Sequence, residues 1–293
     1  MVVSPLQLLT ISVTAALSAY LGPVLVPMIL DRLTPHLSEL NIIPSRPSSS
    51  QISRACAPHN YSVQLISHSP LLVYISNFVT PQESRGIIEV GTPLLERSPI
   101  TGDSATPEAR TSSSAPLPGG DLTVRCVLER AEQFLGGLMG GRDEMGVSQM
   151  VSYGDGDKFD LHTDWFSRPK ITDEDLERGR KRMYNRLATF FVVLEAEGIE
   201  EGSGETWFPF IDGEENVGEE GNSRLWRKHE DGGVAVKAVA GNAVFWVNLL
   251  VDKQNGTVTG DRRTVHAGLP VKGVGARKKA MNIWPRRFFG PDT

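Results

Sequence analysis

The second half of this chain consists of short runs of strand-forming residues. From Val147 onward, runs of valine, leucine, phenylalanine and tryptophan are separated by glycine, aspartate and asparagine, which favour turns. Many short strands joined by glycine-rich turns predict a β-sandwich or β-barrel rather than a helical domain. The clearest predicted strands are Gln149–Tyr153 and residues 187–194, 233–239, 243–249, 264–266 and 280–285.

Helical patterns precede this region. Apolar residues recur at helical spacing across Leu122–Leu135, which predicts a helix with one buried face. A second helix is predicted over residues 81–95, with Thr80 as N-cap and Pro81 at the first helical position. Residues 71–75 predict a strand before it. The expected fold class is α+β, mainly β, with the helices packed outside a sheet.

The N-terminal segment has a different composition. Residues 2–30 lack charged side chains and are predominantly apolar, and about 20 apolar residues suffice to span a bilayer. We expect residues 1–30 to be a single-pass membrane anchor, with a cleaved signal peptide or a buried helix as alternatives. Residues 31–66, which include a Pro/Ser-rich stretch, are expected to be a linker, and residues 67–293 a single domain.

His162-Thr163-Asp164 and the distant His266 form a candidate metal site. Residues two apart on a strand point to the same face, so His162 and Asp164 can share one ion, which His266 can complete from another strand. Two imidazoles and one carboxylate with open positions are typical of non-haem Fe(II) oxygenases. A structural zinc site usually includes cysteine, but Cys56 and Cys126 are both distant from the motif.

The net charge limits the kinds of partner that the protein can bind, and the sequons and cysteines indicate its cellular compartment. The net charge is −5, and the chain has no basic run long enough for nucleic-acid binding. Two N-glycosylation sequons begin at Asn60 and Asn255, and the two cysteines either form one disulfide or remain reduced thiols. These features favour an endoplasmic reticulum membrane protein with a lumenal catalytic domain, with secretion as the alternative.

The candidate ligands belong to a longer series of motifs. Tyr-Gly-Asp-Gly-Asp-Lys-Phe at 153–159 precedes them, and Gly-Glu-Thr-Trp-Phe-Pro at 204–209 and Asn-Ile-Trp-Pro-Arg at 282–286 follow. In this order the series resembles the prolyl 4-hydroxylase family of Fe(II)- and 2-oxoglutarate-dependent dioxygenases, from about residue 72 to residue 287. The resemblance implies a double-stranded β-helix, or jelly roll, that uses Fe(II), 2-oxoglutarate, O2 and ascorbate. It also implies that prolyl residues of a peptide or protein are hydroxylated, with release of succinate and CO2.

The resemblance assigns roles to single residues. His162, Asp164 and His266 match the iron ligands, and Tyr153 and Thr206 match groups that contact the cosubstrate. Arg277, Lys278 and Lys279 compete for the basic residue that pairs with the far carboxylate of 2-oxoglutarate. Counting from the Asn-Ile-Trp motif and strand parity both select Lys278. Arg186 matches an arginine near the peptide substrate.

One departure from the family pattern and two inserted segments leave substrates other than prolyl residues as alternatives. Phe159 stands where the family commonly has a tyrosine that holds substrate, so a hydrogen bond is lost there. The charged segment 167–184 and the Glu/Gly-rich segment 198–231 are expected to be solvated loops or a lid over the site. The alternatives are the same chemistry on a small molecule or another side chain, or a non-catalytic jelly-roll module.

Overall fold

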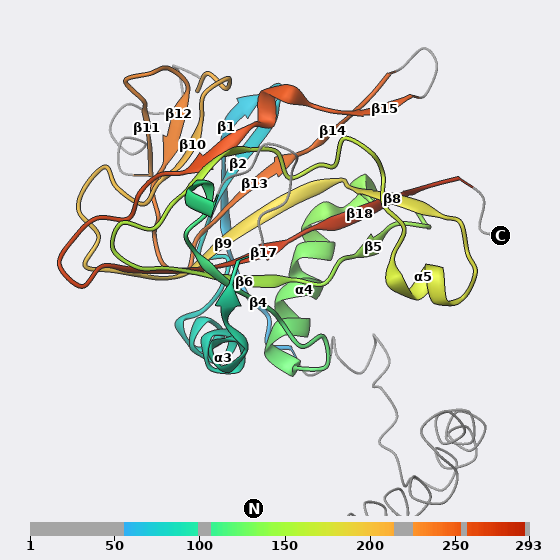
Figure 1. Ribbon diagram of the computed structural model, residues 1–293, viewed down its shortest axis with the longest axis horizontal. Coiled ribbons are helices and arrows are strands. Elements are labelled where there is room, and N and C mark those ends of the chain that lie inside the picture. The colour runs from blue at the N-terminus through green and yellow to red at the C-terminus, as the bar shows by residue number, and fades with distance from the viewer. Residues whose placement is uncertain (1–55, 99–106, 214–224, 253–256, 291–293) are drawn as a thin grey trace, which may run out of the picture. The chain divides into compact units, whose positions relative to one another are not determined.

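The computed structural model describes residues 56–98, 107–213, 225–252 and 257–290 (Figure 1). Residues 1–30, where we expect a membrane anchor or signal segment, lie outside these ranges, as do residues 31–55 and Asn255 of the second sequon. No helix within the described ranges is both long and apolar enough to cross a bilayer. Membrane association therefore stays a prediction from the sequence.

Eight antiparallel strands form the larger sheet, in the order β1-β2-β13-β9-β17-β6-β4-β3. Since β1 pairs with β2, this sheet begins earlier in the chain than the boundary expected at residue 67. The register shift between Leu65 and Ser67 interrupts the alternation of β1, which is why its sequence did not predict a strand. The strands are β1 (Ser62–His68), β2 (Leu71–Ser76), β3 (Glu96–Arg97), β4 (Ser113–Pro116), β6 (Gln149–Tyr153), β9 (Ala188–Glu197), β13 (Ala243–Val247) and β17 (Arg277–Ile283).

A five-stranded sheet, ordered β11-β12-β10-β16-β7, completes the β core. Its strands are β7 (Phe159–His162), β10 (Thr206–Phe208), β11 (Trp226–Lys228), β12 (Val234–Val236) and β16 (His266–Gly268). From β6 to β17 the chain passes repeatedly between the larger and the smaller sheet, as a double-stranded β-helix does. The predicted fold class, a mainly β jelly roll with flanking helices, is therefore confirmed.

Smaller elements surround this core. The strands β14 (Leu249–Val251) and β15 (Val258–Gly260) form a two-stranded ribbon, while β5 (Glu144–Met145), β18 (Pro285–Phe289) and β8 (Met183–Arg186) form a three-stranded sheet. The charged segment 167–184 contains the short helix α5 (Asp173–Glu177). The 3-10 turns are η1 (Thr92–Leu94), η2 (Pro107–Ala109), η3 (Gly136–Leu138) and η5 (Arg262–Thr264).

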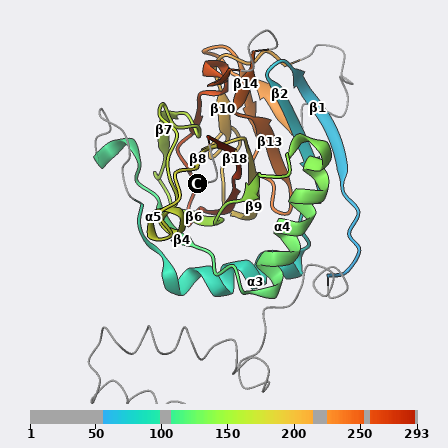
Figure 2. The same cartoon turned by 90° about the vertical axis from the view of Figure 1, so that its right-hand side faces the viewer.

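Two helices, α3 (Pro81–Gly91) and α4 (Leu122–Leu135), lie on the same side of the larger sheet (Figures 1 and 2). The bounds of α4 agree with the prediction. The capping box that Thr80 forms with Glu83 begins α3, but the helix ends earlier than expected, at Gly91. A 3-10 turn that contains Pro93 follows, because proline has no backbone N–H with which to continue the helical hydrogen bonds.

Each face of the larger sheet has its own apolar core. The outer face packs against the helices, and Phe190 of β9, Met281 of β17 and Val127 of α4 belong to the same apolar core. The inner face packs against the smaller sheet, through residues such as Phe191 and Trp246. Both faces of β9 are covered, so its sequence is continuously apolar rather than alternating.

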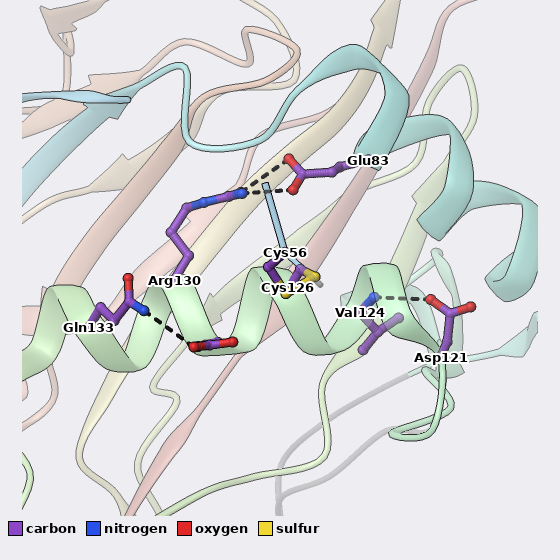
Figure 3. The surroundings of a disulfide bond; sticks show 8 residues. Cys56, Glu83, Asp121, Val124, Cys126, Arg130 and Gln133 are labelled. Atoms are coloured by element: carbon purple, nitrogen blue, oxygen red, sulfur yellow. Dashed lines mark hydrogen bonds and ion pairs between the residues drawn. A yellow bond between two sulfur atoms is a disulfide. The ribbon is translucent and has the colours of Figure 1, made fainter. Parts of the chain in front are cut away.

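A disulfide between Cys56 and Cys126 joins the first described residue to α4 (Figure 3). The sequence left open whether these cysteines pair, and the structure pairs them across 70 residues of chain. On the same helix, Arg130 binds Glu83 of α3 at 2.7 Å. The two helices and the chain before β1 are thus linked both covalently and by an ion pair.

Candidate metal centre and active site

The predicted metal ligands meet between two neighbouring strands of the smaller sheet. His162 ends β7, His266 begins β16, and the two residues are paired directly across the strands. The Nε2 atom of His162 lies 3.9 Å from Oδ1 of Asp164, and Nε2 of His266 lies 4.0 Å from Oδ2. All three ligand atoms lie within 4.8 Å of one another. The register of β7 and β16 therefore brings together residues about a hundred positions apart.

Both imidazoles are oriented by the backbone. The Nδ1 atom of His162 lies 2.8 Å from the carbonyl of Asp160, and Nδ1 of His266 lies 3.0 Å from the carbonyl of Thr264. A carbonyl only accepts hydrogen bonds, so each Nδ1 carries the proton and each Nε2 presents a lone pair. This tautomer is the one that binds a metal through Nε2, with the second nitrogen held in place. The donor set therefore fits a divalent metal ion.

The carboxylate of Asp164 is held from behind. Its Oδ2 accepts hydrogen bonds from Thr189 Oγ1 at 2.7 Å and from Trp284 Nε1 at 3.1 Å. Thr189 in turn accepts one from Asn248 Nδ2 at 2.9 Å. Oδ1 has only looser contacts, with the guanidinium of Arg186 at 3.7 Å and with Nε2 of His162 at 3.9 Å. These contacts fix one carboxylate oxygen and leave the other available to an ion.

The charges of the site match the needs of a metal. Burial lowers the pKa of the His162 imidazole to about 3, and the neighbouring His266 acts in the same direction. Burial alone would raise the pKa of Asp164, but His266, Arg186 and His162 outweigh it and lower that pKa to about 2. At neutral pH the site holds a neutral imidazole at His162 beside an ionised carboxylate. Divalent metals bind ligands in this protonation state.

Aromatic rings enclose the two histidines. Phe159 stacks on His162 with 3.6 Å between ring centroids, and the guanidinium of Arg110 lies 4.5 Å from the centroid of Phe159. On the other side, Trp246 meets His266 edge-on at 4.7 Å. Phe159, which the sequence suggested for substrate contact, thus lies directly against a ligand and also lines the cavity.

Lys278 enters the core of the domain. It is 2% exposed, and its Nζ donates a hydrogen bond to the carbonyl of Gly204 at 2.6 Å. The ammonium also lies 4.9 Å from the ring centroid of Phe191 and 5.4 Å from that of Tyr153. Burial lowers the pKa of Lys278 to about 7. The positive charge of Lys278 is poorly offset by its surroundings, so an anion bound next to it would stabilise the charged form.

The two other basic residues at the start of β17 point away from the core. Arg277 contacts Glu195 and Glu197, and Lys279 binds Glu195 at 3.1 Å. Alternation along the strand accounts for the difference, as the sequence predicted. Of these three residues, Lys278 is the one that the fold buries beside the cavity.

Tyr153 and Thr206 lie on the walls of the same cavity. Tyr153 ends β6 directly opposite Lys278 of β17, and burial raises the pKa of its hydroxyl, which therefore stays protonated. Thr206 begins β10, opposite Gly268 of β16. The structure thus brings both predicted cosubstrate residues close to the lysine and to the three ligands.

A cavity of about 710 Å³ contains the site, and its size suits a small cosubstrate together with part of a substrate. Arg186 lies on its wall, with the guanidinium 3.5 Å from the ring centroid of Trp284 and 4.9 Å from that of Phe166. The ligands, Tyr153, Thr206, Phe159 and Arg186 all line this cavity, while Lys278 lies behind the rings of Tyr153 and Phe191.

Sequence reasoning missed several residues of the site. Arg110 is 9% exposed and lines the cavity, and Thr189 and Asn248 are fully buried behind Asp164. Shared strand parity with Lys278 could have identified Trp284, whereas no spacing relative to the ligands assigns the other three to the site. Outside the site, the ligand atom of His229 lies within 4.8 Å of those of Glu230 and Asp231, which are both exposed.

Comparison with known proteins identifies the family. Residues 148–286, which include all three candidate ligands, match the 2OG-Fe(II) oxygenase superfamily. These residues form an oxygenase domain of this superfamily. The match agrees with the donor set and the jelly-roll topology, and the protein is therefore a 2-oxoglutarate-dependent dioxygenase.

Its relatives include prolyl 4-hydroxylases. The oxygenase is 29% identical over 232 residues to a probable prolyl 4-hydroxylase 10 of Arabidopsis thaliana, which covers 76% of this chain and 71% of the relative. It is 29% identical to the prolyl 4-hydroxylase subunit alpha-1 of Homo sapiens over 73% of this chain, but spans only 34% of that relative's length. Among solved structures, the 2OG complex of the viral collagen prolyl hydroxylase from Paramecium Bursaria Chlorella virus-1 has a TM-score of 0.48 and 22% identity, and covers 73% of this chain and 95% of the other.

Proposed function

We propose that this oxygenase hydroxylates prolyl residues of a peptide or protein, consuming 2-oxoglutarate and O2 and releasing succinate and CO2. The observation that carries the proposal is the convergence of His162, Asp164 and His266 with both imidazoles held in the metal-binding tautomer. The similarity to prolyl 4-hydroxylases of Arabidopsis thaliana and Homo sapiens supports proline as the target.

In this proposal His162, Asp164 and His266 hold Fe(II). When bound, the iron with 2-oxoglutarate and O2 supplies the oxidising chemistry, and ascorbate keeps the metal reduced. The protein contributes geometry: two backbone carbonyls fix the imidazoles, and Thr189 and Trp284 fix the carboxylate. Phe159 and Trp246 lie against the two histidines and reduce their exposure to water.

Lys278, Tyr153 and Thr206 are proposed to bind 2-oxoglutarate. The ammonium of Lys278 pairs with the far carboxylate, either through its two remaining donors or by giving up the carbonyl of Gly204. The Tyr153 hydroxyl, which stays protonated, donates a second hydrogen bond to that carboxylate, and Thr206 contacts the cosubstrate from β10. Binding of the dianion restores the charge of Lys278, whose pKa is lowered to about 7 by burial.

Arg186 and Phe159 are proposed to contact the substrate. Arg186 is held between two aromatic rings and lies 3.7 Å from Asp164, so it can orient a substrate carbonyl next to the metal. His162 and Arg110 lie against the ring of Phe159, and the part of the ring that lines the cavity offers an apolar surface without a hydroxyl. A pyrrolidine ring packs well against such a surface, but its specificity then depends on other groups in the cavity.

Succinate release from the full chain with Fe(II), 2-oxoglutarate and ascorbate tests the proposal, with and without proline-containing peptides. We expect peptide-dependent succinate and hydroxyproline, and loss of both in His162→Ala, Asp164→Ala and His266→Ala. Arg178→Gln, on the exposed end of α5, serves as a control that retains activity. Slow succinate release that ignores peptides would move the substrate to a small molecule or another side chain, and no succinate from the metal-loaded protein would indicate a non-catalytic module.

We also propose that the oxygenase works in the endoplasmic reticulum, with residues 1–30 as its anchor and the catalytic domain in the lumen, or else that it is secreted. The disulfide of Cys56 with Cys126 supports an oxidising compartment, and the exposed Asn60 supports access to glycosylation. Cell expression followed by glycosidase digestion and carbonate extraction tests both points. A glycosidase-sensitive form that resists extraction is expected, whereas a glycosidase-sensitive form released into the medium would indicate secretion.

A further inference from the structure

Several arginines elsewhere in the described domain have a carboxylate partner. Arg130 binds Glu83 at 2.7 Å, and Arg227 binds Glu205 at 2.7 Å. A cation close to apolar surface loses hydration, and a nearby carboxylate offsets that loss. Cations without such a partner are therefore candidates for binding an anion from outside.

The wall of the cavity carries cations that lack a carboxylate partner. It is lined by Arg110, Arg168, Lys170 and Arg186, and by one carboxylate, Asp164. Within the described part of the chain, Arg110, Arg168 and Lys170 form no ion pair with a carboxylate. The chain as a whole carries a net charge of −5, so the positive cavity is a local feature. It attracts anions to a site on an otherwise acidic protein.

Arg168 and Lys170 belong to the charged segment 167–184, and that segment is ordered so that they face the cavity. The backbone of Lys170 exchanges two hydrogen bonds with that of Tyr184 in β8, at 2.9 and 2.7 Å. Its ammonium lies 4.1 Å from the ring centroid of Phe166. Both basic side chains are exposed, so they form the mouth of the cavity rather than its floor.

The acidic part of the same segment is turned away from the cavity. Asp175 of α5 is fully buried and binds Arg182 at 2.9 Å and Arg180 at 3.4 Å. None of the acidic residues of α5 is among those that line the cavity. Glu174 and Asp175 are thus paired within the segment, and Arg168 and Lys170 stay unneutralised at the mouth.

These cations lie on a different part of the domain from the lysine proposed for 2-oxoglutarate. Lys278 is near the start of β17. Lys170 instead pairs with Tyr184 of β8, and Tyr184 pairs with Phe288 of β18, ten residues further along the chain than Lys278. A cosubstrate held by Lys278 therefore leaves Arg168 and Lys170 free for a different anion.

We propose that Arg168 and Lys170 form a carboxylate-binding subsite that selects peptides with an aspartate or glutamate close to the target proline. This inference rests on the proposed function, since it assigns a substrate class to the same site. Lys170 and Arg168 meet the acidic side chain at the mouth while Arg186 and Phe159 hold the proline next to the ligands. The preference is electrostatic and therefore weakens as salt increases.

A panel of peptides tests the subsite. A host peptide with one proline carries glutamate, or isosteric glutamine, at each position from three before to three after the proline. The full chain, supplied with Fe(II), 2-oxoglutarate and ascorbate, is assayed for kcat/KM by succinate release, and peptide affinity is measured separately by fluorescence anisotropy without O2. The variants are Lys170→Gln, Arg168→Gln and the double variant, with Arg178→Gln as a control of equal charge change outside the cavity lining.

At the best position the glutamate peptide should bind about fivefold more tightly than its glutamine partner at low salt, as expected for two exposed ion pairs. Each single substitution should reduce this ratio, the double variant should abolish it, and Arg178→Gln should leave it unchanged. Equal affinity for both peptides at every position, or an unchanged ratio in the double variant, would overturn the subsite. Fluorescence anisotropy tests the subsite even if no peptide stimulates succinate release. A lack of stimulation would refute the proposed function but not the subsite.

Discussion

Replacing Thr189 by valine removes one hydroxyl from behind the metal centre and little else. The Thr189 side chain is fully buried, donates to Asp164 Oδ2 at 2.7 Å and accepts from Asn248 Nδ2 at 2.9 Å. Valine has nearly the same shape, so the surrounding packing is retained. Asp164 then keeps only the hydrogen bond from Trp284 on that oxygen, and the Asn248 amide loses its acceptor.

Two magnitudes follow from this geometry. Loss of a partner that orients a metal ligand typically weakens metal binding by about 10- to 100-fold. A buried amide left without its acceptor lowers the free energy of unfolding by about 2 kcal/mol. Thr189→Ser retains the hydroxyl and loses only a methyl group, so we expect it to restore most of the metal affinity. The two variants thus separate the hydrogen bond from the packing.

Metal affinity is measured by titrating the full chain with Fe(II) without O2 and following tryptophan fluorescence. Trp284 donates to Asp164 and Trp246 lies 4.7 Å from His266, so both indoles report on the site. Thermal unfolding is measured in parallel. The reasoning fails if Thr189→Val binds the metal as tightly as the native protein, or if Thr189→Ser is as weak as Thr189→Val.

Three further predictions concern the cosubstrate lysine and the disulfide. Lys278→Ala should raise the KM for 2-oxoglutarate at least tenfold, whereas Arg277→Ala, on the opposite face of the strand, should leave it unchanged; the reverse result would reassign the anion partner. Burial lowers the pKa of Lys278 to about 7, and only the charged form binds the dianion, so this KM should rise with pH, about tenfold from pH 6 to pH 8. A flat profile would mean that Lys278 stays charged. Replacing Cys56 and Cys126 by serine should cost about 4 kcal/mol of unfolding free energy in chemical denaturation, because the bond closes a loop of 70 residues; an unchanged midpoint would contradict this.

The sequence predicted those parts of the fold in which one local pattern decides the outcome. The apolar spacing of Leu122–Leu135 set the bounds of α4, and strand parity separated Lys278 from its two basic neighbours. Parity was sufficient because a strand offers only two faces, and one of them was already assigned by Asn282 and Trp284.

Other parts depend on contacts between distant residues. Strand β1 was missed because a register shift hides its alternation, and β11 lies within a Glu/Gly-rich stretch that reads as a loop. The support behind Asp164 comes from β9 and from the residue after β13, so no spacing in the sequence connects Thr189 with Asn248. Arg110 was assigned to the site only from the structure, in which its guanidinium lies over the ring of Phe159.

The disulfide also determines how the domain responds to mechanical load. β1 is the edge strand of the larger sheet, and a pull from its N-terminal end would peel its hydrogen bonds from β2 one after another. Cys56 precedes that strand and is bonded to Cys126 in α4. Tension that arrives through the chain before Cys56 therefore passes into the helix, which rests on the outer face of the sheet, and β1 bears none of it.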